Sequence, residues 1–407
     1  MGVYSGTASR VKLDIIGVLL KKEENEVAKK GFTLNNIPIV VSSSSATGKN
    51  GWALCIGAGV SLPIFPDWYT LAAKLANDCC LSTMDRNDMI KLEFSPDALI
   101  QMIKNTTVIS DYEFSLKMSK ILYKELRNKV DSEDWNAMVD VLESNHISAC
   151  SADKWEIFKK YRDTLFVSTT SYGLAKVILK SIDSNIAPKS ILSFNAEPLL
   201  FTILNSFILE DKTSESRTIP KQIFNKVTSS LSNQGDNRIP YIFCHGLLPI
   251  KENSSTFSCS IDKLVFLEEE YLQLANTSFS WQANAFLSAC LSHHVIFIGT
   301  SLIDQNMRRW LSWIHSNRIT EMKQHGLNVE NSTQHYWIRQ IPKDLRQIPW
   351  IEAAVAHLGI RLIWLNNWSE ASVALEKLLG MYKAPNLVPK RKTSIIVHKK
   401  KTKKHSP

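Results

Sequence analysis

Short apolar runs that alternate with longer helical stretches constrain the fold of this chain more than any other feature. Several runs are apolar without alternation and rich in β-branched residues, which is typical of strands buried on both faces of a parallel sheet. The sequence therefore predicts an α/β fold with a doubly wound, mainly parallel sheet. The predicted strands are Trp52–Ile56, Ser190–Phe194, Tyr241–Cys244, Lys263–Phe266, Val295–Ile298, Tyr336–Arg339 and Arg361–Leu365.

Helical periodicity fills the stretches between these runs. The region from Trp68 to Ser181 contains no convincing strand, so we interpret residues 68–185 as a helical module inserted after the first strand. The polar segment Asp211–Pro240 is predicted to be rich in loops. The other predicted helices are Glu268–Leu291, Asp304–Ser316, Ile351–Leu358 and Ser369–Met381.

These patterns suggest one Rossmann-like α/β domain over residues 46–385. Residues 1–45 are expected to be an N-terminal extension that forms a helix and a hairpin. Residues 386–407 form a strongly basic tail, which contributes much of the net charge of +9. Such a tail is usually solvated and disordered, and contact with nucleic acid or an acidic partner is the alternative interpretation.

The composition is that of a globular protein, with 44% hydrophobic and 21% charged residues. No two of the seven cysteines have C-x-x-C spacing, which argues against a zinc ribbon, and we predict no metal site. No apolar run approaches the roughly 20 residues of a membrane-spanning helix, and no signal peptide is evident. We therefore expect a cytoplasmic protein with reduced cysteines and no membrane contact.

The segment Leu54–Ser61 carries the strongest local signal for a ligand. A strand runs into Gly57-Ala58-Gly59, and a serine follows at position 61. Glycines at such a turn let the backbone approach a pyrophosphate closely, and the next helix offers its amides. The dinucleotide fingerprint G-x-G-x-x-G lacks its third glycine here, because position 62 is leucine. A tight turn without a ligand is therefore the alternative.

Three further segments follow in a fixed order, each at the carboxyl end of a predicted strand: Ser193–Glu197, Tyr241–Gly246 and Phe297–Asp304. With the G-A-G-x-S loop, this order of an asparagine turn, an H-G pair and a G-x-S loop resembles the sirtuins. The pattern is more similar to bacterial sirtuin-like domains of antiphage defence systems than to protein deacylases. The resemblance covers roughly residues 50–380 and implies a site at the carboxyl edge of the sheet.

The resemblance implies a role for each matching residue. The first glycine loop would hold the pyrophosphate of NAD⁺, the Pro66-Asp67-Trp68 segment would close over nicotinamide, and the last loop would hold the phosphates and the adenosine ribose. The implied catalytic residues are Asn195, which orients the attacking group, and His245, which acts as the base. The implied NAD⁺-binding residues are Gly57, Ala58, Gly59, Ser61, Asp67, Gly299, Thr300, Ser301 and Asp304.

Several of these residues also have a simpler structural interpretation. Asp67 and Asp304 are placed to cap helices. Glu197 could contact the ribose or serve as an acid in a first helical turn, and the helix acid is the favoured interpretation. Asn195 suits a turn with unusual backbone angles, and His245 suits a strand end.

The sequence departs from the sirtuin pattern in ways that bear on activity. Phe194 stands where sirtuins usually carry glutamine, Glu197 replaces an aspartate, and Tyr69 stands where deacylases often have arginine. The zinc-binding cysteine quartet, which shapes the peptide groove of deacylases, is absent. The resemblance therefore implies hydrolysis of NAD⁺, as a substrate, to nicotinamide and ADP-ribose in abortive-infection defence. A zinc-free deacylase and a non-catalytic nucleotide sensor are the alternatives.

Indiscriminate NAD⁺ hydrolysis would kill the host cell, so control of the activity is expected. Sirtuin-like proteins of this length and layout resemble those paired with a HerA-type hexameric ATPase. We therefore expect a homo-oligomer, a separately encoded activating partner, or both.

Overall fold

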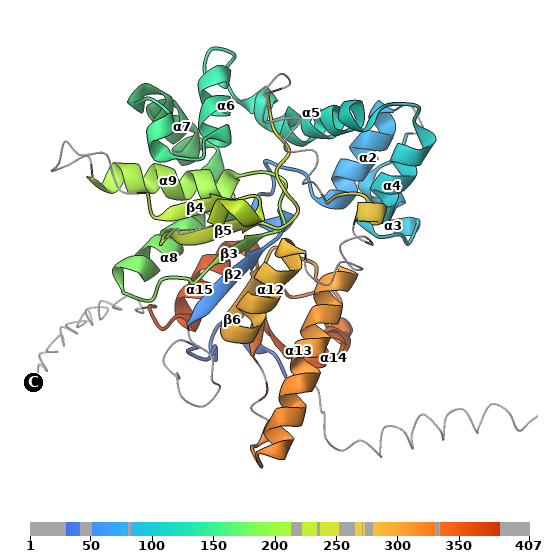
Figure 1. The fold of residues 1–407 in the computed structure, drawn as a ribbon, viewed down its shortest axis with the longest axis vertical. Helices are drawn as coiled ribbons and strands as arrows, with labels where there is room; N and C mark the ends of the chain where they lie inside the picture. Colours follow the sequence, from blue (N-terminus) through green and yellow to red (C-terminus); the bar gives the residue numbers. More distant parts are fainter. Residues whose placement is uncertain are drawn as a thin grey trace, which may run out of the picture.

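A parallel sheet of eight strands forms the centre of the computed structural model (Figure 1). The structure describes residues 30–40, 51–79, 83–212, 222–233, 237–251, 265–270, 272, 280–329, 332 and 334–382. Within them the strands follow the order β1-β8-β7-β6-β2-β3-β5-β4, and every neighbouring pair is parallel. The strands are β1 Phe32–Thr33, β2 Trp52–Ile56, β3 Ile191–Ser193, β4 Phe224–Val227, β5 Ile239–Phe243, β6 His294–Ile298, β7 His335–Gln340 and β8 Ile360–Leu365.

Burial on both faces explains why the strands lack alternation. Along β2, Leu54 and Ile56 belong to one hydrophobic core, whereas Ala53 and Cys55 belong to the core on the opposite face. All of β2 is fully buried. The prediction of a doubly wound, mainly parallel α/β sheet is confirmed.

Helices cover both faces of this sheet (Figure 1). α8, α9 and α15 contribute side chains to the core on one face, and α12, α13 and α14 contribute to the other. The helices are α2 Trp68–Asp78, α3 Arg86–Lys91, α4 Pro96–Thr106, α5 Asp111–Lys129, α6 Trp135–Glu143, α7 Ala152–Thr164, α8 Thr170–Asp183, α9 Leu199–Lys212, α12 Trp281–Ser292, α13 Gln305–Gln324, α14 Ile348–Ala356 and α15 Ala371–Leu378. Short 3₁₀ turns are η1 Ala58–Val60, η2 Ile147–Ala149, η3 Phe166–Ser168, η4 Ser230–Asn233, η6 Leu345–Gln347 and η7 Trp368–Glu370.

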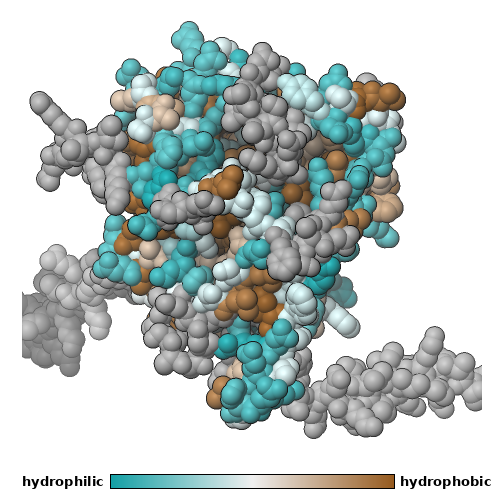
Figure 2. Space-filling model, viewed as in Figure 1, coloured by the Kyte–Doolittle hydropathy of each residue, from teal (hydrophilic) through white to brown (hydrophobic). Residues whose placement is uncertain are grey.

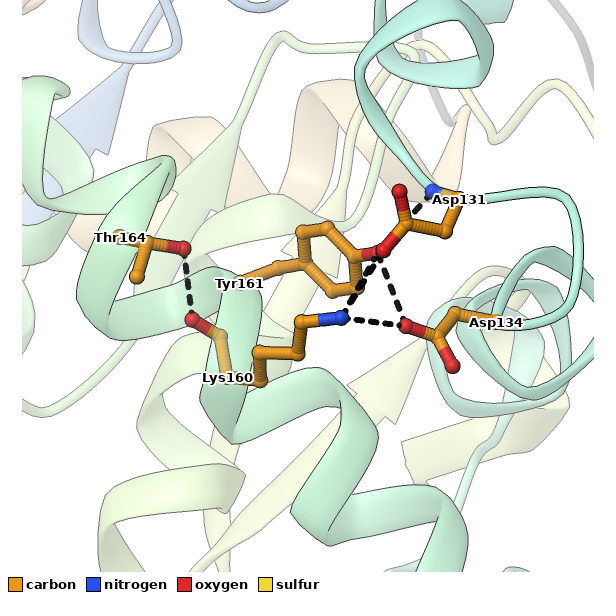
Figure 3. Close-up of polar contacts among 5 residues, drawn as sticks. All are labelled: Asp131, Asp134, Lys160, Tyr161 and Thr164. Carbon is orange, nitrogen blue, oxygen red and sulfur yellow. Dashed lines mark hydrogen bonds and ion pairs between the residues drawn. The ribbon is translucent and has the colours of Figure 1, made fainter.

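The expected helical module is present as α2 to α8, which lie between β2 and β3 in the chain. Local signals set its helix starts: Ser110 accepts a hydrogen bond from the Glu113 amide, and the Glu113 carboxylate accepts one from the Ser110 amide. A polar clasp joins the α5–α6 turn to α7 (Figure 3). In it, the Lys160 ammonium lies 2.9 Å from carboxylate oxygens of both Asp131 and Asp134. Because Lys160 is about half exposed, the clasp fixes geometry more than it adds stability.

Two sequence predictions are wrong and a third is incomplete. Val265 and Phe266 do not form a strand, because they pack in a loop where the Val265 amide donates to the His245 carbonyl at 3.1 Å; residues 263–264 lie outside the described part. The segment Asp211–Pro240, predicted to be rich in loops, also contains the strand β4, which pairs with β5. The long helix predicted from Glu268 is interrupted, because Ser280 is extended and caps a new helix, α12, that starts at Trp281.

The N-terminal extension supplies an edge strand, since β1 pairs in parallel with β8 rather than in a hairpin. Its backbone is fixed by Glu352, whose carboxylate accepts hydrogen bonds from the Gly31 amide and the Trp364 indole, both at 2.8 Å. The expected helix before it and the basic tail lie outside the described residues. In the part of the chain that is described, every helix is too short or too polar to span a bilayer.

The face shown in Figure 2 is mostly hydrophilic, with separate apolar areas, one of them over α12. Leu291 of this helix is 60% exposed.

Candidate functional site

The predicted site residues lie on four loops at one edge of the sheet. The strands β6, β2, β3 and β5 are neighbours in this order, so their carboxyl ends lie side by side. The loops that follow them carry Gly299, Gly57, Asn195 and His245. The sheet reverses its winding direction at β2, which pairs with both β3 and β6, and such switch points are where α/β proteins bind ligands.

The two glycine-bearing loops contact each other directly through their backbones. The Gly57 amide donates to the Ile298 carbonyl at 3.1 Å, and the Gly59 amide donates to the Gly299 carbonyl at 2.9 Å. A Cβ added at Gly57 would stand 2.7 Å from the Gly299 oxygen, and one at Gly59 would stand 2.9 Å from it. The neighbouring loop therefore fills the space that the missing side chains leave, and the binding of a pyrophosphate by these glycines stays a prediction.

Gly299 is itself fixed by this contact. Its φ of +71° is unfavourable for residues with a side chain, and a Cβ there would meet the Val60 amide nitrogen at 2.7 Å. The Thr300 carbonyl accepts a hydrogen bond from the Trp337 indole at 3.1 Å, whereas Ser301 is exposed. The loop is thus held on its inner side and open to solvent at Ser301.

Asn195 lies at the centre of a buried polar cluster. Its side-chain nitrogen donates to the Glu197 carboxylate at 2.9 Å and lies 3.4 Å from the Ser61 hydroxyl, which donates to the same carboxylate oxygen at 2.5 Å. All three residues are at most 3% exposed. The carbonyl oxygen of the Asn195 side chain is buried and has no hydrogen-bond partner among the residues that the structure describes. A buried acceptor without a donor is uncommon and needs an explanation.

A small pocket lies against this cluster. Its walls come from the first glycine loop, the Phe65–Trp68 segment and the Asn195–Glu197 turn, closed by leucines of α2 and α5. The cavity is only about 10 Å³, which is room for about one water molecule. We expected a cleft sized for a dinucleotide, so this expectation is corrected: the loops converge, but the described residues pack tightly where they meet.

Asp67 is part of this wall segment but does not line the pocket. Its carboxylate caps α2 by accepting from the Thr70 amide at 2.8 Å, and its other oxygen lies 2.6 Å from Nε of Arg86. Burial alone would raise the pKa of Asp67, but the hydrogen bonds from Thr70 and Arg86 outweigh it and hold the pKa below its usual value. The helix-capping interpretation of Asp67 is therefore confirmed, and its contact with nicotinamide stays a prediction.

His245 is buried among aromatic rings. Its ring centroid lies 4.9 Å from that of Phe194, 6.2 Å from that of Trp68 and 6.3 Å from that of Phe266. Burial lowers the pKa of His245 to about 3, so its imidazole is neutral at physiological pH. Phe194 precedes Asn195 and Trp68 lines the pocket, so the histidine and the asparagine lie on the same edge of the sheet, with aromatic rings between the histidine and the pocket.

Asp304 connects the last loop to this histidine. One carboxylate oxygen caps α13, accepting from the amides of Asn306 at 2.8 Å and Met307 at 3.0 Å. The other lies 4.0 Å from Nε2 of His245. The capping interpretation is confirmed, and the second oxygen remains in reach of the histidine.

Glu197 belongs to the site, although the sequence favoured a purely structural role for it over a ribose contact. One of its oxygens accepts from the Leu199 amide at the start of α9, as the helix-acid interpretation suggested, but the other accepts from Ser61 and Asn195. Burial raises the pKa of Glu197 despite these hydrogen bonds. The sequence signal that identifies Glu197 as a site residue is its position two residues after Asn195. Within the described residues, no group of three His, Cys, Asp or Glu side chains could hold a metal ion.

Comparison with known families adds to this geometry. Residues 207–363 match a family model described as the SIR2-like domain, and no curated protein matches the chain. The matched region includes His245 and the loop from Gly299 to Asp304, and the sheet brings Gly57 and Asn195, which lie before it, to the same edge. SIR2-like domains use NAD⁺, so the match indicates an NAD⁺-dependent enzyme. The match over residues 207–363 supports a sirtuin-like domain in this part of the chain.

Proposed function

We propose that the chain is an NAD⁺ glycohydrolase, which uses water to cleave the bond between nicotinamide and ribose. The products are nicotinamide, ADP-ribose and one proton. Nicotinamide leaves as a neutral molecule while positive charge develops on the ribose. The protein must therefore hold the ribose, separate the nicotinamide from it and supply a water that loses its proton.

The observation that carries this proposal is the unpartnered side-chain oxygen of Asn195. Leaving a buried acceptor without a donor costs about 1–3 kcal/mol, so a ligand that supplies the donor binds with that advantage. A ribose hydroxyl, the amide of nicotinamide or a water molecule can each donate to this oxygen. The side-chain nitrogen is already held by Glu197, which fixes which end of the carboxamide faces the ligand.

His245 is suited to take the proton. Burial keeps the imidazole neutral at physiological pH. One of its ring nitrogens therefore carries no proton and can accept one from the attacking water. The Asp304 carboxylate, 4.0 Å from Nε2, favours the imidazolium that forms once the proton has transferred.

Binding requires the wall of the pocket to open. About 10 Å³ does not admit a nicotinamide ring. The segment that closes the pocket, Pro66–Trp68, leads into the first residue of α2 and is not part of the sheet. In this proposal the loop moves to admit NAD⁺ and returns over the nicotinamide, which excludes bulk water from the ribose.

The test is to incubate the purified protein with NAD⁺, without peptide, and to measure released nicotinamide by chromatography. We expect His245→Ala and Asn195→Ala each to lower the rate by about 10²–10⁴-fold. The matched control is His325→Ala, which changes an exposed histidine at the far end of α13, about 30 Å along the helix from Asp304. Circular dichroism confirms that each variant is folded.

The other outcomes contradict the proposal in different ways. Turnover only in the presence of an acyl-lysine peptide would identify a zinc-free deacylase. Saturable NAD⁺ binding without products, unchanged by His245→Ala, would identify a nucleotide sensor.

We also propose the setting of this activity: a cytoplasmic enzyme that depletes NAD⁺ in antiviral, abortive-infection defence. Control would come from homo-oligomerisation or from a separately encoded partner such as a HerA-type ATPase, and the basic tail is available for nucleic acid. Analytical ultracentrifugation combined with the nicotinamide assay tests the control. A stable monomer that is fully active without any partner would contradict it.

A further inference from the structure

A second pocket lies beside the candidate site, at the carboxyl ends of β4 and β5. Its volume is about 560 Å³, within the range of about 300–1,000 Å³ that small-molecule pockets occupy. Thr228 follows β4, Gly246 to Lys251 follow β5, and α6 and the start of α7 complete the wall. In Figure 1 these two helices lie on the same side of the strands as α9, which runs between them and β4. Gly246 of the H-G pair lines this pocket, but the proposed reaction does not use it.

The pocket carries an excess of positive charge. Lys154, Lys226 and Lys251 line it, against the two carboxylates of Asp140 and Glu143. Lys154 and Lys251 both pair with Asp140, on opposite oxygens. Glu143 accepts the backbone amides at 250 and 251, at 2.7 and 2.8 Å. The charges of these four residues are thus engaged with one another or with the backbone.

Lys226 carries the charge that remains. Its ammonium has two long contacts, to the carbonyl oxygens of Glu143 and Ser144, both at 3.4 Å, and it stands 5.8 Å from the ring centroid of Phe201. Among the described residues, no carboxylate lies within the 4 Å of an ion pair with it. Burial lowers the pKa of Lys226 to about 8, although Glu143 acts in the opposite direction, so the group is still mostly protonated at pH 7. A protonated amine in this position feels Glu143 only at a distance and is not ion-paired with any described carboxylate.

We propose that this pocket binds a small organic monoanion, a carboxylate whose charged group contacts the Lys226 ammonium. Leu142, Leu248 and Pro198 give the pocket apolar wall that suits the body of such a molecule. One excess positive charge matches a carboxylate better than a phosphate dianion. Phosphate sites commonly supply arginine forks or a cluster of backbone amides, and no arginine lines this pocket.

The wall of this pocket is bonded to the candidate site. The Leu248 amide donates to the Ala196 carbonyl at 2.9 Å, and the Leu248 carbonyl accepts from the Tyr123 hydroxyl at 2.9 Å. Ala196 lies between Asn195 and Glu197. If the proposed NAD⁺ hydrolysis is correct, an occupant will therefore change the rate of turnover; the binding proposal itself does not depend on that activity.

The experiment measures binding of cyclohexanecarboxylate to the full chain by isothermal titration calorimetry, without NAD⁺. Cyclohexanecarboxamide is the neutral probe of the same shape, and inorganic phosphate is the small dianion. Lys226→Met removes the charge but keeps most of the side-chain volume, and Lys226→Arg keeps the charge. The matched control is Lys180→Met, because Lys180 is an exposed lysine of α8 outside the pocket.

The proposal predicts saturable binding of the carboxylate to the wild type and to Lys180→Met. Lys226→Met should weaken it about 10- to 100-fold, the scale of a lost charge-assisted hydrogen bond, and Lys226→Arg should restore most of it. Three results would overturn it: carboxamide binding as tight as carboxylate binding, an unchanged affinity in Lys226→Met, or no saturable carboxylate binding up to about 10 mM. Phosphate binding tighter than carboxylate binding would also reject the ligand class. Because the readout is binding without NAD⁺, failure here leaves the hydrolase proposal standing.

Discussion

Burial of His245 should make the protein less stable in mild acid, by an amount that can be worked out. The pKa of His245 is about 3 in the folded protein and about 6.5 in the unfolded chain. Between these values the unfolded chain binds more protons, so the free energy of unfolding falls as pH falls through this window. From pH 7 to pH 5 the loss from this one residue is about 2 kcal/mol. That is a large part of the stability of a typical domain.

Urea unfolding at pH 7, 6 and 5, followed by tryptophan fluorescence, measures this loss. His245→Gln keeps a neutral polar side chain but cannot titrate, so it should lose about 2 kcal/mol less than the wild type over the same range. The exposed residue His325 supplies the control, since His325→Gln should keep the pH dependence of the wild type.

The contributions of other titratable groups to the free energy of unfolding cancel when the wild type is compared with His245→Gln. Glu197 has a raised pKa in the folded protein, so its contribution has the opposite sign: it stabilises the fold at low pH and that contribution is lost as pH rises through the folded pKa. Because both proteins contain Glu197, the difference between them isolates the histidine. Equal losses in the wild type and in His245→Gln would refute the claim that burial keeps this imidazole neutral.

Three further predictions concern the backbone contacts that build the site and the sheet edge. Gly57→Ala should destabilise the fold by about 1–3 kcal/mol and abolish NAD⁺ binding, because its Cβ would stand 2.7 Å from a backbone oxygen of the facing loop. Gly326→Ala, which has φ of +64° but open space around its Cβ, should lose about 1–2 kcal/mol and bind NAD⁺ normally; equal binding by the two variants would count against the loop contact. Asp304→Ala should lose about 1 kcal/mol with faster hydrogen exchange in the first turn of α13, and unchanged exchange would show that the cap is unimportant. Glu352→Ala should cost about 1–3 kcal/mol and speed exchange at the Gly31 amide; protection of that amide in the variant would mean that β1 is held by other contacts.

The sequence predicted the sheet and the convergence of the loops for one physical reason. Parallel strands buried on both faces are continuous apolar runs, and their carboxyl ends must share an edge. Trp52–Ile56 and Val295–Ile298 were therefore recognisable, and the glycine turns that follow them could be expected to meet.

The features that the sequence did not predict depend on contacts between distant residues. β4, with the sequence Phe-Asn-Lys-Val, has little apolar content and is a strand because β5 pairs with it. β1 has only two residues and depends on β8. The tight pocket could not be foreseen either, because it results from side chains of α2 and α5 that pack over the turn at Asn195.

The position of β2 at the middle of the sheet has a consequence for synthesis on the ribosome. Leu54 pairs with Ile191 on one side and with Ile296 on the other, so both neighbours of β2 are synthesised much later than β2 itself. At about 5–20 residues per second, the first of these partners follows after roughly 7–27 s. The intervening helices make mostly local contacts and can form during that interval. The nascent chain therefore carries the apolar strand β2 without a partner while its helical module is already folding. This unpaired strand favours misassembly until β3 emerges and pairs with it.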